Sequence, residues 1–211
     1  MEKIDLKKKW KHLYAPSYKK VDVVDVPDFL FVMVDGRIEP GMEPATSKAF
    51  QDAISALYGV SYTLKFMSKR REDDPVDFTV MALEALWWTD PGEFDMAKKD
   101  EWKWTAMMMQ PEHITEAMFQ KAVQEVGKKK DNPALTKIRF QRFHEGLCMQ
   151  IMHIGPYADE PETIAKMHAF AREHGYRLRG KHHEIYLGDP RRSKPERLKT
   201  VLRQPVEAPK A

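Results

Sequence analysis

Residues 81–88 read MALEALWW, and residues 182–192 read HHEIYLGDPRR. Each stretch is a short run of apolar and aromatic residues that one carboxylate interrupts, at Glu84 and at Glu184, 100 positions apart. Runs of this composition are typical of β-strands. An unpaired charge is costly to bury in such a strand, so each carboxylate is expected to serve a purpose. The two stretches are therefore predicted to be equivalent strands in the two halves of the chain.

The segments around these strands follow the same order in both halves. Continuous apolar runs predict strands, and apolar residues recurring at a spacing near 3.6 predict helices. For the first half this predicts a strand at 29–34, a helix from residue 44, and strands at 78–88 and 102–109. For the second half it predicts a strand at 147–154, a helix at 160–174, a strand at 182–187 and a final edge strand at 199–204.

This order predicts an α+β fold built from duplicated strand-helix-strand-strand repeats. The first repeat is placed at about 22–110 and the second at about 138–206, with a linking helix at about 115–130 inside a single domain of residues 1–211. Side by side, the repeats would form a concave antiparallel sheet with the helices on its outer face. A ligand crevice is expected between the repeats.

Composition restricts the class of protein. The 211 residues carry a formal net charge of only +3, so no dominant electrostatic field for nucleic acid is expected. No segment reaches the roughly 18 apolar residues of a membrane-spanning helix, and the lysines of the N-terminus precede no apolar signal segment. A cytoplasmic protein without a membrane partner is the expectation. The single cysteine, Cys148, excludes an intramolecular disulfide and a cysteine-based zinc cage.

Side-chain alternation groups the candidate site residues. In a strand, Glu84 shares a face with Trp88, and Glu184 shares a face with His182 and Tyr186. If equivalent strands meet between the repeats, both carboxylates would line one pocket that also contains these rings. The competing interpretation places one or both glutamates at the exposed rim of the sheet or in an ion pair with Arg or Lys.

Aromatic residues and methionines form a second group of candidate ligand contacts. Trp87 and Trp88 end one predicted strand, and Trp102 and Trp104 lie on one face of the next, with Met108 further along it. Large rigid rings can stack on a flat ligand and exclude water from it. Packing in the core is the alternative for each indole, and the methionines suit a core as well as an adaptable binding surface.

Several other kinds of chemistry find no support in the sequence. His182 and His183 are adjacent in a predicted strand, so their side chains point to opposite faces and cannot jointly hold one metal ion. There is no glycine-rich nucleotide-binding motif and no G-x-S-x-G elbow. We therefore expect neither a metal nor a cofactor.

Four segments together resemble the GyrI-like small-molecule-binding family in its stand-alone form. They are DVPDFLFVMVDGR (25–37), MALEALWW (81–88), WKWTAMMMQPEHIT (102–115) and HHEIYLGDPRRSKPERLKTVLRQPV (182–206). The resemblance covers about residues 22–206 and is most specific in the last segment. It implies the same two-repeat fold with a concave crevice, and it places the family's acidic ligand-binding residue at Glu184.

The resemblance also implies a function. Stand-alone members that resemble this chain include hydrolases of cyclopropane-bearing, DNA-alkylating aromatic antibiotics of the duocarmycin type. The expected catalytic residues are then Glu184, as general base on a water molecule, and Tyr186, which would position the water or donate a proton to the developing phenolate. Two alternatives remain at this stage. One is a protein that binds or sequesters planar or cationic drugs without chemistry, and the other is a modulator of a topoisomerase.

Overall fold

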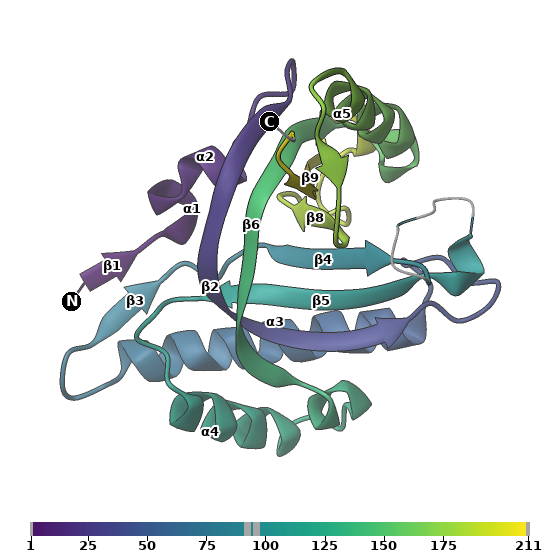
Figure 1. Ribbon diagram of the computed structural model, residues 1–211. Helices are drawn as coiled ribbons and strands as arrows, with labels where there is room; N and C mark the ends of the chain where they lie inside the picture. The colour runs from purple at the N-terminus through teal and green to yellow at the C-terminus, as the bar shows by residue number, and fades with distance from the viewer. Residues whose placement is uncertain (1, 91–93, 95–97, 210–211) are drawn as a thin grey trace.

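A six-stranded antiparallel β-barrel forms the centre of the protein, which we describe from a computed structural model covering residues 2–90, 94 and 98–209 (Figure 1). Neighbouring strands follow the order β6-β2-β5-β4-β8-β9, and β9 pairs back with β6 to close the ring. The strands are β2 (Asp22–Arg37), β4 (Leu83–Trp88), β5 (Lys103–Gln110), β6 (Arg139–Ile154), β8 (His182–Tyr186) and β9 (Lys199–Glu207).

The two longest strands, β2 and β6, hold the barrel together. They pair from Asp22 opposite Gln150 to Met33 opposite Arg139. The far end of β2 then pairs with β5, and the far end of β6 pairs with β9. Each long strand therefore belongs to both sides of the barrel, which is why both curve strongly in Figure 1.

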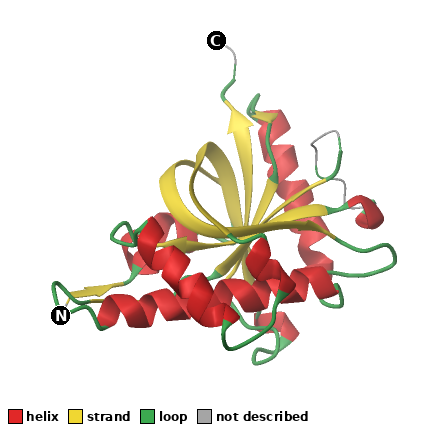
Figure 2. Cartoon of the chain, turned by 90° about the horizontal axis from the view of Figure 1, so that it is seen from below, coloured by secondary structure: helices red, strands yellow, loops and turns green. Residues whose placement is uncertain are grey.

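Helices cover the outer face of the barrel (Figure 2). The helix α3 (Lys48–Lys69) begins at Ser47, whose hydroxyl accepts a hydrogen bond from the backbone N–H of Phe50 at 3.2 Å, a common N-cap arrangement. The helix α5 (Glu160–Glu173) packs on β6, and α4 (Glu116–Gly127) packs on α3. None of the described helices combines the length and apolar character that crossing a bilayer requires.

The N-terminal segment packs against the inner face of the barrel. It contains β1 (Glu2–Ile4), α1 (Leu6–Lys9) and α2 (Lys11–Tyr14). Leu13 and Tyr14 are buried in the same apolar cluster as the barrel residues Leu86 and Met107. The strand β1 pairs in parallel with β3 (Val76–Phe78). The remaining short elements are β7 (Arg177–Leu178) and the 3-10 turns η1 (Lys99–Glu101), η2 (Pro133–Thr136), η3 (Tyr157–Asp159) and η4 (Pro195–Arg197).

The structure agrees with the predicted fold class and corrects two details. Helix and strand alternate as expected, and both halves contain the order strand, helix, strand, strand. The sheet is closed into a barrel, however, where an open concave sheet was predicted. The segment predicted as an edge strand, 199–204, lies inside β9, which pairs with β6, β8 and β7. Closure leaves the six barrel strands without an open edge, and the duplication itself stays a prediction.

Candidate functional site

The pairing of β4 with β8 decides where the two glutamates point. The strands are neighbours, as predicted, but Ala85 lies opposite Glu184, and Glu84 lies opposite Ile185. Directly opposed residues share a face of the sheet, and adjacent residues do not. Glu84 therefore points into the barrel while Glu184 points outward. The prediction that both carboxylates line one pocket is wrong.

Glu184 is held on the outer face by a chain of hydrogen bonds. The phenol O–H of Tyr186 donates to Glu184 Oε2 at 2.6 Å, and the indole N–H of Trp87 donates to the Tyr186 oxygen at 3.1 Å. Burial and the neighbouring Glu184 carboxylate raise the pKa of the Tyr186 phenol well above its ordinary value. Tyr186 thus remains a donor near neutral pH and fixes the orientation of Glu184.

A second carboxyl group, Glu160, reaches the same place from the first turn of α5. It is 4% exposed. Burial, followed by the Glu184 carboxylate, raises the pKa of Glu160 to about 9. Glu160 is therefore protonated at neutral pH next to Glu184. Carboxyl groups driven toward different protonation states by their surroundings are a recurrent feature of acid–base sites.

Unpartnered polar atoms gather around this carboxyl pair. Within the described residues, both ring nitrogens of His182 are buried without a hydrogen-bond partner, and the Thr200 hydroxyl reaches Glu160, whose pKa it acts to lower. Thr200 lies opposite Tyr186 across the β8–β9 pair. His182 Nε2 approaches Glu184 Oε1 to 3.5 Å without forming a hydrogen bond of good geometry. Buried polar atoms without partners are rare and point to a missing partner such as a ligand.

Aromatic rings flank these polar groups. Tyr157, in η3 at the start of α5, meets Tyr186 edge to face with 5.8 Å between ring centroids. The ring of Phe94 stacks on His182 at 4.9 Å and an interplanar angle of 6°. Tyr58 on α3 is close enough to Tyr157 to contribute to raising its pKa, which burial and Glu160 chiefly raise to about 12. The site thus combines one acidic pair with ring faces from four segments.

Glu84 belongs to a different group of residues inside the barrel. It accepts hydrogen bonds from the Tyr14 hydroxyl at 2.7 Å and from His183 Nε2 at 3.0 Å. The other ring nitrogen of His183 bonds to Glu145 at 2.9 Å, and Arg203 Nη1 donates to Glu145 at 3.1 Å. Positive and negative side chains therefore alternate along this fully buried series of hydrogen bonds.

The pKa values of this inner network follow from that alternation. Burial alone would lower the pKa of His183, but the carboxylates of Glu145 and Glu84 outweigh burial and raise it to about 9. Burial likewise acts to raise the pKa of Glu145, but the positive charges of His183 and Arg203 outweigh burial and lower this pKa to about 2. At neutral pH the network thus holds compensating charges. Glu84 is thus paired inside the barrel, but with His183 and Tyr14, where the competing interpretation from the sequence named Arg or Lys as the partner.

The tryptophans divide between packing and the site. Trp87 and Trp102 lie 5.6 Å apart in the core beneath α3, and Phe50 links Trp87 to Trp104. Trp88 projects to the opposite face, where the Lys181 ammonium lies 3.3 Å from its ring centroid. The expected group of four indoles is therefore three indoles in the core and one outside it. Among them, Trp87 takes part in the Glu184 site through its N–H.

Met108, the remaining predicted contact, is a core residue. It is fully buried beneath α3, and its sulfur lies 3.7 Å from the Ser61 hydroxyl. Two open clefts, of about 730 and 680 Å3, are not lined by Glu184, although the predicted contacts Trp88 and Trp104 line the second. No cluster of three or more metal-ligating side chains is found within the described ranges.

Sequence reasoning missed Glu160, Tyr157, Phe94 and Thr200. Glu160 follows Gly155-Pro156, in the first helical turn, where acidic residues are common because they favour the helix dipole. Its sequence context therefore looks ordinary. A signal was available in Tyr157, an aromatic residue directly after a turn, but only the docking of α5 shows that both residues reach Glu184.

The protein is thus a closed α+β barrel that carries an acidic pair flanked by aromatic rings on its outer face. The chain belongs to the GyrI-like family, because the model of the GyrI-like small molecule binding domain matches residues 19–207. This confirms the resemblance seen in the sequence. No curated protein matches the chain.

Solved structures agree with this assignment. An uncharacterized conserved protein from Listeria innocua is 41% identical, with a TM-score of 0.85 over 97% of this chain and 100% of its own. A hydrolase from Listeria innocua is 40% identical, with a TM-score of 0.83 over 98% of this chain and 100% of its own. The C-terminal domain of EcmrR, 11% identical with a TM-score of 0.55 over 90% of this chain and 98% of its own, shares the fold.

Proposed function

We propose that this protein binds planar aromatic small molecules at Glu184 and hydrolyses those that carry a strained cyclopropane ring. The observation that carries the proposal is the pairing of Glu184, oriented by Tyr186, with the protonated Glu160 beside unpartnered buried polar atoms. Such a reaction would protect a cell from DNA-alkylating compounds, which amounts to detoxification or antibiotic resistance. The similarity to Listeria innocua proteins described as hydrolases, at 40% identity, supports a hydrolytic reaction.

In the proposed reaction, a water molecule bound to Glu184 attacks the methylene carbon of the cyclopropane. Glu184 takes the proton from the water, and a new carbon–oxygen bond forms as one carbon–carbon bond of the ring breaks. The released electron pair moves into the conjugated system of the substrate and leaves a phenolate oxygen. The substrate gains one water in total, and the strained alkylating group is lost.

The second carboxyl group, Glu160, supplies the proton that the ring-opened product needs. Because its pKa is about 9, Glu160 carries a proton at neutral pH that it can donate to the phenolate. Tyr186 acts as a positioning residue, since its hydroxyl is already engaged with Glu184 at 2.6 Å. The rings of Tyr157 and Phe94 would hold the flat ligand by stacking and exclude bulk water. Glu184 and Glu160 would thereby transfer the protons, Tyr186 would position Glu184, and Tyr157 and Phe94 would bind the ligand.

The decisive experiment measures the mass of a duocarmycin-type cyclopropanoid after incubation with the protein and with its Glu184→Gln variant. We expect a gain of one water with the wild type only, because glutamine keeps the shape of the side chain but is no general base. Binding of the unreacted compound, followed by quenching of indole fluorescence, should be retained by the variant.

Glu162→Gln, on the exposed part of α5, is the matched control and should turn over like the wild type. Turnover by Glu184→Gln at the wild-type rate would contradict the assigned role of Glu184. An unchanged mass with the wild type, together with protection that increases only in proportion to added protein, would favour the alternative of sequestration without chemistry.

A further inference from the structure

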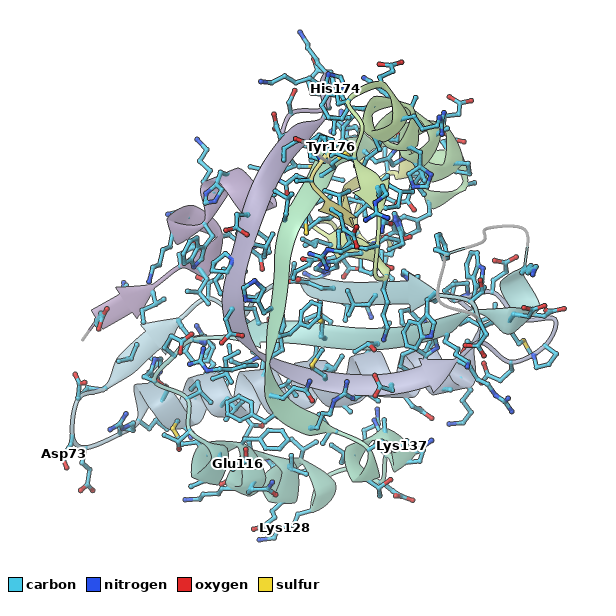
Figure 3. The ribbon with its side chains drawn as sticks, viewed as in Figure 1. Asp73, Glu116, Lys128, Lys137, His174 and Tyr176 are labelled. Carbon is cyan, nitrogen blue, oxygen red and sulfur yellow. The ribbon has the colours of Figure 1, made fainter. Side chains whose placement is uncertain are left out.

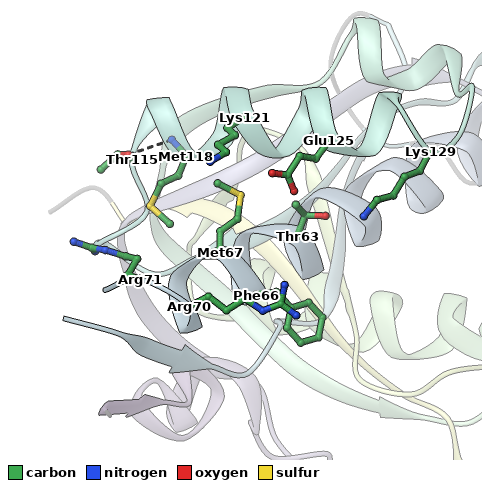
Figure 4. Close-up of a pocket in the computed structure, with 10 residues that line it drawn as sticks. All are labelled: Thr63, Phe66, Met67, Arg70, Arg71, Thr115, Met118, Lys121, Glu125 and Lys129. Carbon is green, nitrogen blue, oxygen red and sulfur yellow. Dashed lines mark hydrogen bonds between the residues drawn. The ribbon is translucent and has the colours of Figure 1, made fainter. Parts of the chain in front are cut away.

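A groove between α3 and α4 lies apart from the Glu184 site, and we call it the α3–α4 groove (Figure 4). Its volume is about 730 Å3, within the range of sites that hold drug-sized ligands. Its apolar surface comes from Phe66 and Met67 on α3 and from Met118 on α4. The Phe66 side chain is 46% exposed, so a ligand in the groove could cover its ring.

Charged side chains surround this apolar surface. Arg70 and Arg71 lie at the end of α3, Lys121 is on α4, Lys129 follows α4, and Glu125 is the single acidic residue among them. The groove therefore holds four cationic groups and one anionic group.

These five charged side chains are not neutralised by the protein. Within the described part of the chain, none of them makes an ion pair or a side-chain hydrogen bond. The Arg70 guanidinium instead lies over the Phe66 ring, 5.6 Å from its centroid. Some exposed arginines elsewhere are paired, such as Arg139 with Asp35 at 2.7 Å. A set of unpaired cations around an apolar surface favours a ligand that brings its own negative charge.

We propose that the α3–α4 groove binds a small amphipathic anion with the chemistry of a medium-chain fatty acid. Its hydrocarbon chain would cover Phe66, Met67 and Met118, and its carboxylate would lie among the cations of the rim. This ligand differs in charge from one suited to the acidic pair of Glu160 and Glu184. The groove is thus a second site with the opposite charge preference, and it does not depend on the reaction proposed for the first.

The shape of the groove supports a ligand that reaches both helices. In Figure 4, Lys121, Glu125 and Lys129 extend from the α4 side toward Thr63 and Met67 on α3. Residues spaced by four positions lie on one face of a helix, so this alignment follows from the sequence of α4. A ligand bound between them would contact one charged row and one apolar row at the same time.

The test is calorimetric titration of the full chain with sodium laurate below its micelle concentration. Lys129→Glu should weaken binding by about three- to tenfold, because it replaces attraction with repulsion near the carboxylate. Glu125→Gln should strengthen binding, because it removes the one negative charge of the groove. Lys128→Glu is the matched control, since it makes the same charge change one residue away, at a side chain that extends outward beyond α4 (Figure 3). Its affinity should stay within about twofold of the wild type.

Four further outcomes would overturn the proposal. Equal losses in Lys129→Glu and Lys128→Glu would mean that laurate responds only to overall charge. Acetate binding as tightly as laurate would mean that the apolar surface plays no part in binding. Dodecyltrimethylammonium, which has the same chain length but a positive charge, binding as tightly as laurate would mean that the cations of the groove play no part. Binding to phosphatidylglycerol vesicles without binding of free laurate would assign the groove to a membrane surface instead.

Discussion

At the scale of single residues, the protein places similar carboxyl groups in three different surroundings. Glu84 is satisfied by a tyrosine and a histidine, Glu145 by a histidine and an arginine, and Glu160 lies beside a second carboxyl group, Glu184. The first two lie in a network whose polar groups are paired. The acidic pair instead lies near the unpartnered ring nitrogens of His182, which is why chemistry is proposed there and not at Glu84.

Replacing Glu160 by glutamine should change how stability depends on pH. The pKa of Glu160 is raised to about 9 in the folded protein, so the folded state binds more protons than the unfolded state between pH about 4.5 and 9. The contribution of Glu160 to stability is therefore complete below pH about 4.5 and is lost as the pH rises through about 9. A neutral glutamine does not titrate, so a Glu160→Gln variant does not lose this stability as the pH rises.

We expect Glu160→Gln to gain stability relative to the wild type as the pH rises from 5 to 8, by at most about 1.4 kcal/mol per pH unit. Urea unfolding at several pH values measures this difference. His183 also titrates in this range, with a pKa of about 9, but it is present in both proteins and cancels. A difference that is constant across the range would show that Glu160 carries no bound proton at neutral pH.

At the scale of elements, the outer face of α3 connects the two proposed sites. Tyr58, Tyr62 and Phe66 follow one another at intervals of four residues and are each at least 36% exposed. Residues at this spacing lie in a row along a helix. Tyr58 lies toward the Glu184 site and Phe66 belongs to the α3–α4 groove, so one helix contributes rings to both.

The contact between β2 and β5 depends on a glycine at position 36. Gly36 lies opposite Trp104, and a Cβ atom added to it would overlap the indole ring. We expect Gly36→Ala to lower the free energy of unfolding by about 1–3 kcal/mol, the usual cost of overpacking a core. Chemical denaturation measures the change.

Gly127→Ala, at the end of α4, is the control for this substitution. The nearest atom to an added Cβ there is a Leu135 methyl at 3.9 Å, which is ordinary contact. This variant should match the wild type or be up to about 1 kcal/mol more stable, because alanine favours the helix. If Gly36→Ala proves as stable as Gly127→Ala, the described packing of Trp104 on β2 is incorrect.

At the scale of the whole molecule, a buried polar network joins the N-terminal segment to the barrel. Arg203 on β9 donates hydrogen bonds to Glu145, to Gln150 and to the backbone oxygen of Leu13. Tyr14 adds a bond to Glu84. Segments from both ends of the chain are thereby tied to the interior of one barrel.

Removing one member of this buried network should lower the free energy of unfolding substantially. Arg203→Met leaves Glu145 without one of its two cationic partners in the interior, and we expect it to lower the free energy of unfolding by about 3–5 kcal/mol. Arg142→Met is the control, since Arg142 is exposed and pairs with Asp28 and Glu112 at the surface, where ion pairs add little to stability; it should unfold close to the wild-type urea concentration. Similar costs for the two variants in urea unfolding would contradict the role assigned to the inner network.

Local patterns in the sequence were enough to predict the three long helices, most strands, the shared strand face of Glu184 and Tyr186, and the family. Those properties depend on side-chain periodicity within a few residues, which a sequence shows directly. Tertiary structure alone decided that Glu84 faces inward, that 199–204 is a central strand, and that Glu160 meets Glu184. Each of these depends on the register between strands or on the docking of a helix, and a shift of one residue in register would exchange the two faces.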